Sequence, residues 1–296
     1  MRAGTPSTAG SAPPRSFVVA ANPQLPEAVR LAEQINDVLN GRDLESIWGS
    51  LNDDSFRHRV EAHPVGLFIA LGGDGTMLRA GQLCAPLDIP ILGINLGHFG
   101  FLTEVRKEDW LAALERVIQG DYWLEQRMML QADHQRRDRR LGSWEALNEC
   151  FIGRGEIVRP VDLTAEIDER YLTTYVADGL IIATPTGSTA YALAAGGPIL
   201  SPELRNILLV PVAPHLSVER PIVLDEGSTV RVAVRTTHQA ILSIDGGLPV
   251  PLESGDRVEI RAGKHVVRFA RLQDPGYFYR NLTSRMNQVA VLGTPG

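Results

Sequence analysis

The sequence predicts two domains, an N-terminal Rossmann-like α/β domain and a C-terminal antiparallel β domain. Three observations carry this prediction. Short runs that are apolar on both faces alternate with amphipathic helices up to about residue 124. Beyond that point, apolar and polar residues alternate with a period of two, as in half-buried antiparallel strands. The chain of 296 residues is long enough for two domains of common size.

The first part of the chain contains three apolar runs and three helical patterns. Pro26 is suited to a first helical turn, and Gly41 and Gly120 are suited to helix ends. Buried strands separated by helices form a parallel sheet that is covered on both faces. The strands are expected at 16–23, 66–73 and 89–97, and the helices at 26–41, 75–84 and 107–120.

The second part of the chain has the residue pattern of an all-β domain. Val230, Val232 and Val234 alternate with polar neighbours, and glycine-containing turns at 245–247 and 254–256 separate such runs. The stretch GYFYRNLTSRMNQV near the end is helical in pattern and is expected to return to the first domain. Residues 1–15 are small, polar and proline-rich, which predicts a disordered leader and not a secretory signal. The expected domains are therefore 16–124 plus about 275–296, and 125–274.

Composition narrows the possible partners. The net charge of −6 gives no overall basic character, so nucleic acid and anionic membranes are not expected as partners. No apolar run approaches membrane-spanning length. Cys84 and Cys150 are two cysteines with no metal-binding spacing, and are expected to be reduced core thiols. These features predict a cytoplasmic protein without a resident metal site.

The segment GGDGT at 72–76 raises a chemical question. Glycines between a strand and a helix let backbone N–H groups approach a phosphate closely. Asp74 does not fit that purpose, because a carboxylate repels phosphate. Its side chain either caps the helix or serves chemistry, as a proton acceptor or beside a metal. The local pattern leaves both readings open.

A second segment, DGLIIATPTGSTAYALAAGGPIL at 178–200, resembles the first in layout. A strand runs into hydroxyls and a glycine at a helix start, which suits a phosphate or a ribose. The small residues that follow leave room for a flat ring, on which Tyr191 could stack. The alternative is a capped helix under tight packing. Two such loops, each with an acid at Asp74 or Asp178, suggest two phosphorylated ligands that meet in a cleft.

Two shorter signals are weaker. Asn148 and Glu149 place an amide and a carboxylate side by side, which could read a base edge or bind ribose hydroxyls. Asp245 lies in a glycine-rich turn, and the turn alone explains it.

Together these motifs resemble the NAD kinase family. GGDGT, Asn148-Glu149 and above all TPTGSTAY after DGLII carry the similarity, with support from GINLGHFGFLTE at 93–104 and PVAPHLSVERPIVL at 211–224. It extends from about Ser16 to the end. GGDGT alone is less specific, since lipid kinases and phosphofructokinases have similar turns.

The resemblance implies an activity and an architecture. The γ-phosphate of ATP, or of polyphosphate, passes to the 2′-hydroxyl of the adenosine ribose of NAD and gives NADP. Mg²⁺ or another divalent metal accompanies the nucleotide. The family has an α/β domain, an all-β domain and a terminal segment packed back on the first, and its members are homodimers or homotetramers.

The resemblance also implies roles for single residues. Asp74 matches the proton acceptor and Gly75 lies beside it in the ligand loop. Asn148 and Glu149 match a pair that contacts NAD. Asp178 matches an acid that contacts the nicotinamide side of NAD. Asp245 matches a turn that reaches the site from a neighbouring subunit. Further ligand contacts are implied for Arg79, Arg159, Thr186, Thr189, Ala190, Tyr191, Ala192, Leu193, Ala194 and Ala213.

Two departures weaken the match. Val176 stands where the family often has a basic residue, and Gly247 where a glutamine is common. Three other functions stay open: a lipid kinase of the same superfamily, a sensor that binds NAD without turnover, and a sugar kinase. A lipid kinase needs an apolar acyl pocket, and a mere sensor has no need of Asp74. The sugar kinase has no support beyond GGDGT.

Overall fold

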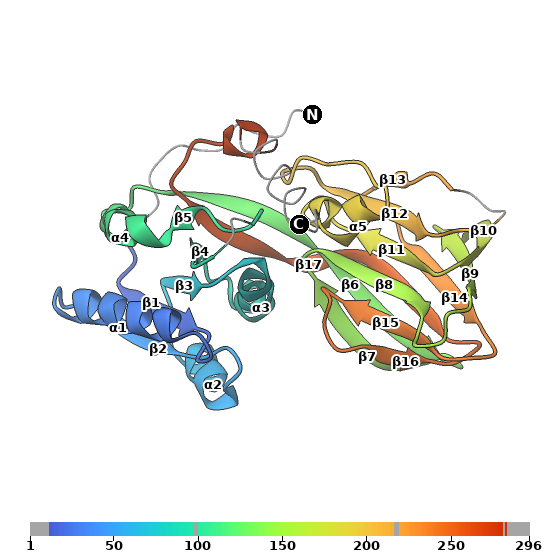
Figure 1. Ribbon diagram of the computed structural model, residues 1–296, viewed down its shortest axis with the longest axis horizontal. Helices are drawn as coiled ribbons and strands as arrows, with labels where there is room; N and C mark the ends of the chain where they lie inside the picture. Colours follow the sequence, from blue (N-terminus) through green and yellow to red (C-terminus); the bar gives the residue numbers. More distant parts are fainter. Residues whose placement is uncertain (1–11, 98–99, 216–218, 281, 283–296) are drawn as a thin grey trace, which may run out of the picture. The chain divides into compact units, whose positions relative to one another are not determined.

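The computed structural model describes residues 12–97, 100–215, 219–280 and 282. These residues form two compact units (Figure 1). The first unit contains the residues up to Gln126 and those from Val267 onward, and the second unit contains Arg127–Val266. Two long strands, β6 (Trp123–Arg136) and β17 (Arg257–Arg271), carry the chain between the units. The predicted fold class, α/β followed by antiparallel β, is confirmed.

The first unit is built on a parallel sheet in the order β2-β1-β3-β4, with the last part of β17 next to β4. The three predicted strands are present. One strand and one helix were not predicted, because β2 is nowhere fully buried and α2 buries only Phe56 and Val60, so neither has a clear apolar period. The strands are β1 (Ser16–Ala21), β2 (Glu45–Gly49), β3 (Leu67–Leu71), β4 (Ile91–Asn95) and β5 (Val105–Arg106).

Helices cover both faces of this sheet, as predicted. Helices α1 (Pro26–Asn40) and α4 (Trp110–Ile118) share one core with every second residue of β1 and β3. On the other face, α2 (Asp54–Ala62) and α3 (Asp74–Cys84) pack so closely that glycines lie beneath them. A Cβ on Gly93 would lie 2.7 Å from the Met77 sulfur, and one on Gly49 would lie 2.4 Å from the Phe56 ring.

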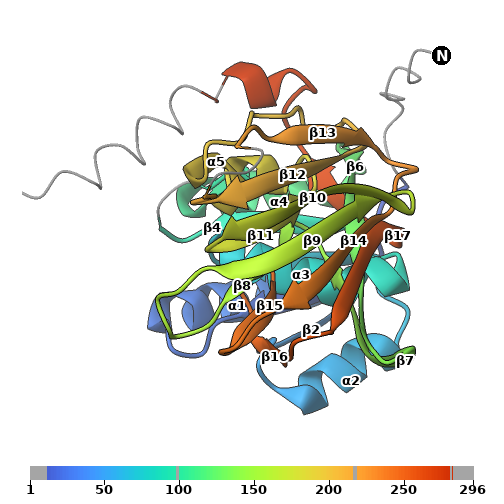
Figure 2. The ribbon, with the colours of Figure 1, turned by 90° about the vertical axis from the view of Figure 1, so that its right-hand side faces the viewer.

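The second unit consists of two sheets with one apolar core between them. One sheet contains β10-β9-β14-β17 with β6 and β7, and the other has the order β13-β12-β11-β8-β15-β16. Figure 2 shows β10, β9 and β14 side by side. The strands are β7 (Arg139–Ala146), β8 (Glu149–Arg154), β9 (Val161–Ile167), β10 (Arg170–Ala177), β11 (Gly179–Ala183), β12 (Asn206–Val212), β13 (Ile222–Asp225), β14 (Val230–Arg235), β15 (Ala240–Ile244) and β16 (Val250–Leu252).

The ends of the chain differ in part from expectation. Most of the expected leader, residues 1–11, lies outside the described residues. Within residues 12–15, Pro14 is buried, the other three residues are exposed, and the Tyr122 hydroxyl donates a hydrogen bond to the Ala12 carbonyl (3.3 Å). The chain re-enters the first unit at Val267, within β17, whereas we expected the return at about 275. Residues 277–280 are helical and Tyr277 is buried; apart from Leu282, the rest of the C-terminal segment is outside the described residues.

Cys84 and Cys150 are both buried and unpaired, as predicted. Within the described ranges, none of the helices has the length and apolar character needed to span a membrane.

Candidate active site

Asp74 is the first residue of α3, directly after the glycine turn that follows β3. The N-cap of this helix is Gly73, so Asp74 does not occupy the capping position. Instead, its Oδ2 accepts a hydrogen bond from the backbone N–H of Phe101 (2.8 Å) and its Oδ1 one from that of Leu102 (3.0 Å). The capping interpretation of Asp74 is therefore wrong. Two fixed donors orient a half-buried carboxylate at the mouth of the glycine turn.

The glycines around Asp74 have different tasks. A Cβ on Gly100 would lie 2.0–2.3 Å from three atoms of the Asp74 carboxyl group, so only glycine leaves room for that carboxylate. Gly73 and Gly75 are exposed, and a Cβ on either meets no atom within 4 Å. The first N–H groups of a helix have no partner within it and favour an anion. The turn is therefore open to a phosphate.

Arg79 lies further along α3 and is exposed. Its guanidinium is 3.5 Å from the side-chain oxygen of Asn52, before α2, and makes no described contact with Asp74. The structure does not bring Arg79 to the carboxylate.

A second cluster forms around Asn148 and Glu149 at the start of β8. The Asp245 carboxylate accepts hydrogen bonds from the backbone N–H groups of Leu147 (2.9 Å), Asn148 (2.7 Å) and Glu149 (3.1 Å). The resemblance placed Asp245 in a neighbouring subunit's site. That expectation stays a prediction; within its own chain, the carboxylate is engaged by the backbone at the start of β8.

The loop after β11 joins this cluster through Thr184 and Gly187. The Thr184 N–H donates to the Asn148 carbonyl (2.8 Å), and its hydroxyl donates to the Leu147 carbonyl (2.6 Å). A Cβ on Gly187 would lie 2.1 Å from the Asn148 carbonyl oxygen, so the two backbones touch. The hydroxyl-rich loop and the Asn-Glu pair are thus one site.

Sequence reasoning missed Arg127 in this cluster. Its guanidinium donates to the Thr186 hydroxyl (3.1 Å), and both side chains are buried. The available signal was an arginine directly before an apolar run in QRMML.

The Glu149 carboxyl group is buried and has an oxygen without a hydrogen-bond partner. The residue is 7% exposed, and the oxygen without a partner is Oε2. Burial, with a smaller contribution from the nearby Asp245 carboxylate, raises the pKa of Glu149 from 4.5 to about 8. A buried acceptor without a partner is the feature expected of a group that meets a ligand hydroxyl.

The raised pKa of Glu149 predicts a pH-dependent stability. The folded state holds this proton more tightly than the unfolded state, so its contribution is full below about pH 4.5 and is lost as the pH rises towards 8. The glutamine amide cannot ionise, so the Glu149→Gln variant does not lose stability as the pH rises. One pKa unit is equivalent to about 1.4 kcal/mol, so the variant should be more stable than the parent at pH 8.5 by a few kcal/mol. Denaturant unfolding of both proteins at pH 5, 7 and 8.5 measures the difference, and parallel curves would contradict it.

The helix after this loop is shorter than predicted. Gly187–Thr189 form a 3₁₀ turn and α5 covers only Tyr191–Ala194. The Ala192 side chain is fully buried against the β11 and β12 core, and the ligand contact predicted for this residue stays a prediction. Tyr191 is 44% exposed and its ring centroid lies 5.6 Å from that of Phe151, which leaves a face open for stacking. Thr189, Ala190 and Leu193 are half-buried and Ala194 is exposed.

Asp178 and Ala213 lie at the opposite end of β11. Glu149 pairs with Ala183 at one end of this strand, whereas Asp178 precedes its first residue and forms an ion pair with Arg154 (3.0 Å). A five-residue strand separates these ends by about 17 Å. Ala213 follows Val212, the hydrogen-bond partner of the Asp178 N–H. The predicted contacts in the second unit therefore form two groups and not one.

Two further expectations concern this end of the strand. Val176 brings no charge, but Arg154 places a cation beside Asp178. Arg159 is exposed in the loop between β8 and β9, away from the Glu149 cluster.

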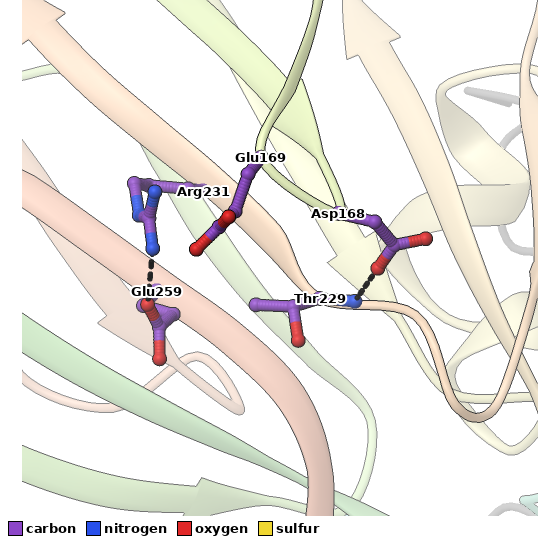
Figure 3. Close-up of a pocket in the computed structure, with 5 residues that line it drawn as sticks. All are labelled: Asp168, Glu169, Thr229, Arg231 and Glu259. Atoms are coloured by element: carbon purple, nitrogen blue, oxygen red, sulfur yellow. Dashed lines mark hydrogen bonds and ion pairs between the residues drawn. The ribbon is translucent and has the colours of Figure 1, made fainter.

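A hollow of about 370 Å³ on the second unit contains none of the predicted residues (Figure 3). It surrounds the hairpin turn at Asp168 and Glu169, whose φ angles of 50° and 63° are those of a tight turn. Asp168 accepts a hydrogen bond from the Thr229 N–H (2.8 Å), and Arg231 pairs with Glu259 (3.0 Å). These contacts join the β9–β10 turn to the segment before β14, and β14 to β17, so they explain the residues as parts of the sheet.

The glycine turn before an oriented carboxylate in the first unit suits a phosphorylated nucleotide, and so does the hydroxyl-rich loop beside a buried acid in the second unit. Both features are expected of a nucleotide-dependent phosphotransferase. Comparison with known proteins supports this class. Residues 52–122 match the ATP-NAD kinase N-terminal domain, and residues 147–272 match the ATP-NAD kinase C-terminal domain. The chain belongs to the NAD kinase family.

Individual relatives agree along most of the chain. The NAD kinase of Chloroflexus aggregans is 39% identical over 267 residues, which cover 90% of this chain and 96% of that protein. The NAD kinase of Heliobacterium modesticaldum is 39% identical over 277 residues, or 91% and 98% of the two chains.

Solved structures show the same fold. Yeast NADH kinase complexed with NADH has a TM-score of 0.81 at 25% identity and covers 92% of this chain and 88% of its own. An NAD kinase from Archaeoglobus fulgidus in complex with ATP has a TM-score of 0.72 at 24% identity, with 92% and 98% covered.

Proposed function

We propose that this enzyme transfers the γ-phosphate of ATP to the 2′-hydroxyl of the adenosine ribose of NAD, giving NADP, with Asp74 as general base. The observation that carries the role of Asp74 is its carboxylate, held by two backbone N–H groups at an open, glycine-lined helix start. A group fixed in this way can accept a proton in one defined direction.

The reaction follows from these positions. The phosphate chain of ATP lies against the N–H groups around Gly73 and Gly75. The Asp74 carboxylate accepts the proton of the 2′-hydroxyl while its oxygen attacks the γ-phosphorus in line, and the bond to ADP breaks. Phosphoryl transfer requires mainly positioning and charge neutralisation from a protein.

A divalent cation fits this arrangement as a companion of ATP. Mg²⁺ prefers oxygen ligands and often keeps to phosphates plus one or two carboxylates. Asp74 is one such carboxylate, and each of its oxygens can accept more than the single hydrogen bond it has. When bound, the cation neutralises the phosphate charge that would otherwise repel Asp74.

The second unit supplies the NAD contacts in this proposal. The unpartnered Glu149 Oε2 and the Asn148 amide take up ribose hydroxyls or an adenine edge, and the exposed Tyr191 ring stacks on a base.

One assay separates the candidate functions. NADP formation is followed with ATP or polyphosphate as donor and NAD or NADH as acceptor, and a diacylglycerol is tested in parallel with labelled ATP. We expect NADP from ATP, Mg²⁺ and NAD. Heat stabilisation by NAD without NADP formation would establish the sensor, and labelled lipid would establish the lipid kinase.

Gly75→Ala tests the phosphate position. Its Cβ meets no protein atom within 4 Å, and alanine is favoured over glycine in a helix by about 1 kcal/mol, so the unliganded variant should be at least as stable as the parent. A bound phosphate would meet the added methyl, so the KM for ATP should rise about tenfold or more, equivalent to about 1.4 kcal/mol. Melting curves and ATP titrations measure both effects. An unchanged KM would place the phosphates elsewhere.

We also propose that the enzyme acts in the cytoplasm as a homodimer or homotetramer. The position of Asp178 at the opposite end of β11 from Glu149 fits a shared site, in which the half-buried Asp178–Arg154 pair serves another subunit. Light scattering gives the number of subunits. Mixing and refolding Asp178→Asn with Glu149→Gln should restore part of the activity if subunits share sites, and a lack of restoration would count against sharing.

A further inference from the structure

A buried arginine of the first unit supports the loop that orients Asp74. We infer that Arg271 is a positioning residue for catalysis, acting through Leu102. The inference rests on the proposed role of Asp74 as the base.

The contacts form a short chain. The Leu102 N–H donates to the Asp74 Oδ1 (3.0 Å), and the carbonyl of the same residue accepts a hydrogen bond from the Arg271 Nη1 (2.9 Å). Leu102 is thus held on one side by Arg271 while it holds the carboxylate on the other. A shift of Leu102 would move one of the two donors that orient Asp74.

Arg271 is itself fixed in one orientation. It is 1% exposed, and its Nε donates to the Glu125 Oε2 (2.7 Å). Its guanidinium carbon lies 4.8 Å from the centre of the Phe269 ring and 5.0 Å from that of the Tyr277 ring. The Tyr277 hydroxyl donates to the same Glu125 oxygen (3.2 Å). A guanidinium with aromatic and carboxylate partners in the core cannot change rotamer at low cost.

The same loop is bound to the chain after β17 a second time. Glu104 Oε1 accepts hydrogen bonds from the backbone N–H groups of Leu272 (2.9 Å) and Gln273 (2.6 Å). Burial would lower the pKa of Arg271, but the Glu125 and Glu104 carboxylates more than offset this and raise it above its ordinary value. The guanidinium therefore stays charged and keeps its donors. The segment 271–273 and the loop 102–104 form one clamp.

A purely structural role would also explain a buried ion pair, so the test must separate stability from positioning. Arg271→Gln and Arg271→Lys are made in the parent and in the Asp74→Asn background. If Arg271 acts through Asp74, Arg271→Gln lowers kcat about 10²-fold in the parent. In the Asp74→Asn enzyme, where no base remains to be positioned, it lowers the residual kcat less than about twofold. The KM for NAD should change little in either background.

Arg271→Lys covers the case in which the glutamine variant fails to fold. It keeps a buried positive charge for Glu125, but a single ammonium cannot reproduce the fork that reaches both Glu125 and the Leu102 carbonyl. We expect a smaller loss of kcat in the parent and again a change of less than about twofold in the Asp74→Asn enzyme.

Arg136→Gln is the matched control. It removes a guanidinium from the fully buried Asp256 carboxylate (2.7 Å) in the second unit, with no described link to Asp74. It should lower the melting temperature and leave kcat unchanged at temperatures where the protein is folded.

The outcomes are distinguishable. Equal losses of kcat in both Asp74 backgrounds, or a normal kcat in Arg271→Gln, would overturn the positioning role. Near-normal turnover of Asp74→Asn alone would instead overturn the proposed base.

Discussion

Asp74→Asn should lower kcat by about 10²- to 10⁴-fold, the usual contribution of a placed general base. The amide can no longer take the proton of the ribose hydroxyl. It also presents an NH₂ group to one of the two backbone donors, Phe101 or Leu102, so one of the two orienting hydrogen bonds is lost. The affinity for NAD should stay within about twofold, since the proposed NAD contacts lie in the second unit. Initial rates of NADP formation and calorimetric titration with NAD measure the two quantities.

Asp53→Asn is the control for this experiment. Asp53 does cap a helix, since its carboxylate accepts a hydrogen bond from the Ser55 N–H (2.9 Å) at the start of α2. Asparagine caps equally well, so this variant loses a carboxylate of the first unit without loss of stability or turnover. Turnover of Asp74→Asn close to that of the parent would remove the base from the mechanism.

Gly100→Ala should also lower kcat, by about 10²-fold. The added Cβ would overlap the Asp74 carboxyl group at 2.0–2.3 Å, so the carboxylate must leave the two N–H groups that hold it. A displacement of about 1 Å at a reacting group is enough for such a loss. Because Asp74 is only half-buried, its side chain can swing outward and the fold should survive.

Gly97→Ala is the matched change in the same loop. Its Cβ meets none of the described atoms within 4 Å, and activity should be retained. A crystal structure of Gly100→Ala with the carboxylate unmoved, or full turnover of that variant, would show that this orientation is not required.

The fold class could be predicted because burial leaves a periodic trace. Strands apolar on both faces and strands with a period of two are different patterns, and both were present in the sequence. The sequences of β2 and α2 have no such periodic pattern, because most of their residues are partly exposed.

The site was predictable where its chemistry is local in the sequence. Asp74 between glycines is such a case. Sequence proximity alone did not reveal that Asp178, eight residues before Thr186, is separated from it by a whole strand. The burial of Glu149, the engagement of the Asp245 carboxylate and the core position of Ala192 depend on tertiary contacts that no spacing reveals. Arg271 gave no signal at all, since an arginine in a strand with a period of two is ordinarily a solvent-facing residue.

The two strands that carry the chain between the units, β6 and β17, have a consequence for biosynthesis. The second unit is inserted in the sequence of the first, and the hydrogen bond between Arg271 and Leu102 joins residues 169 positions apart. Contacts that distant form late in folding, and a chain still on the ribosome cannot make this one before Arg271 has been synthesised. A nascent polypeptide that stops before Arg271 therefore carries the Asp74 carboxylate without the hydrogen bond that holds Leu102 in place.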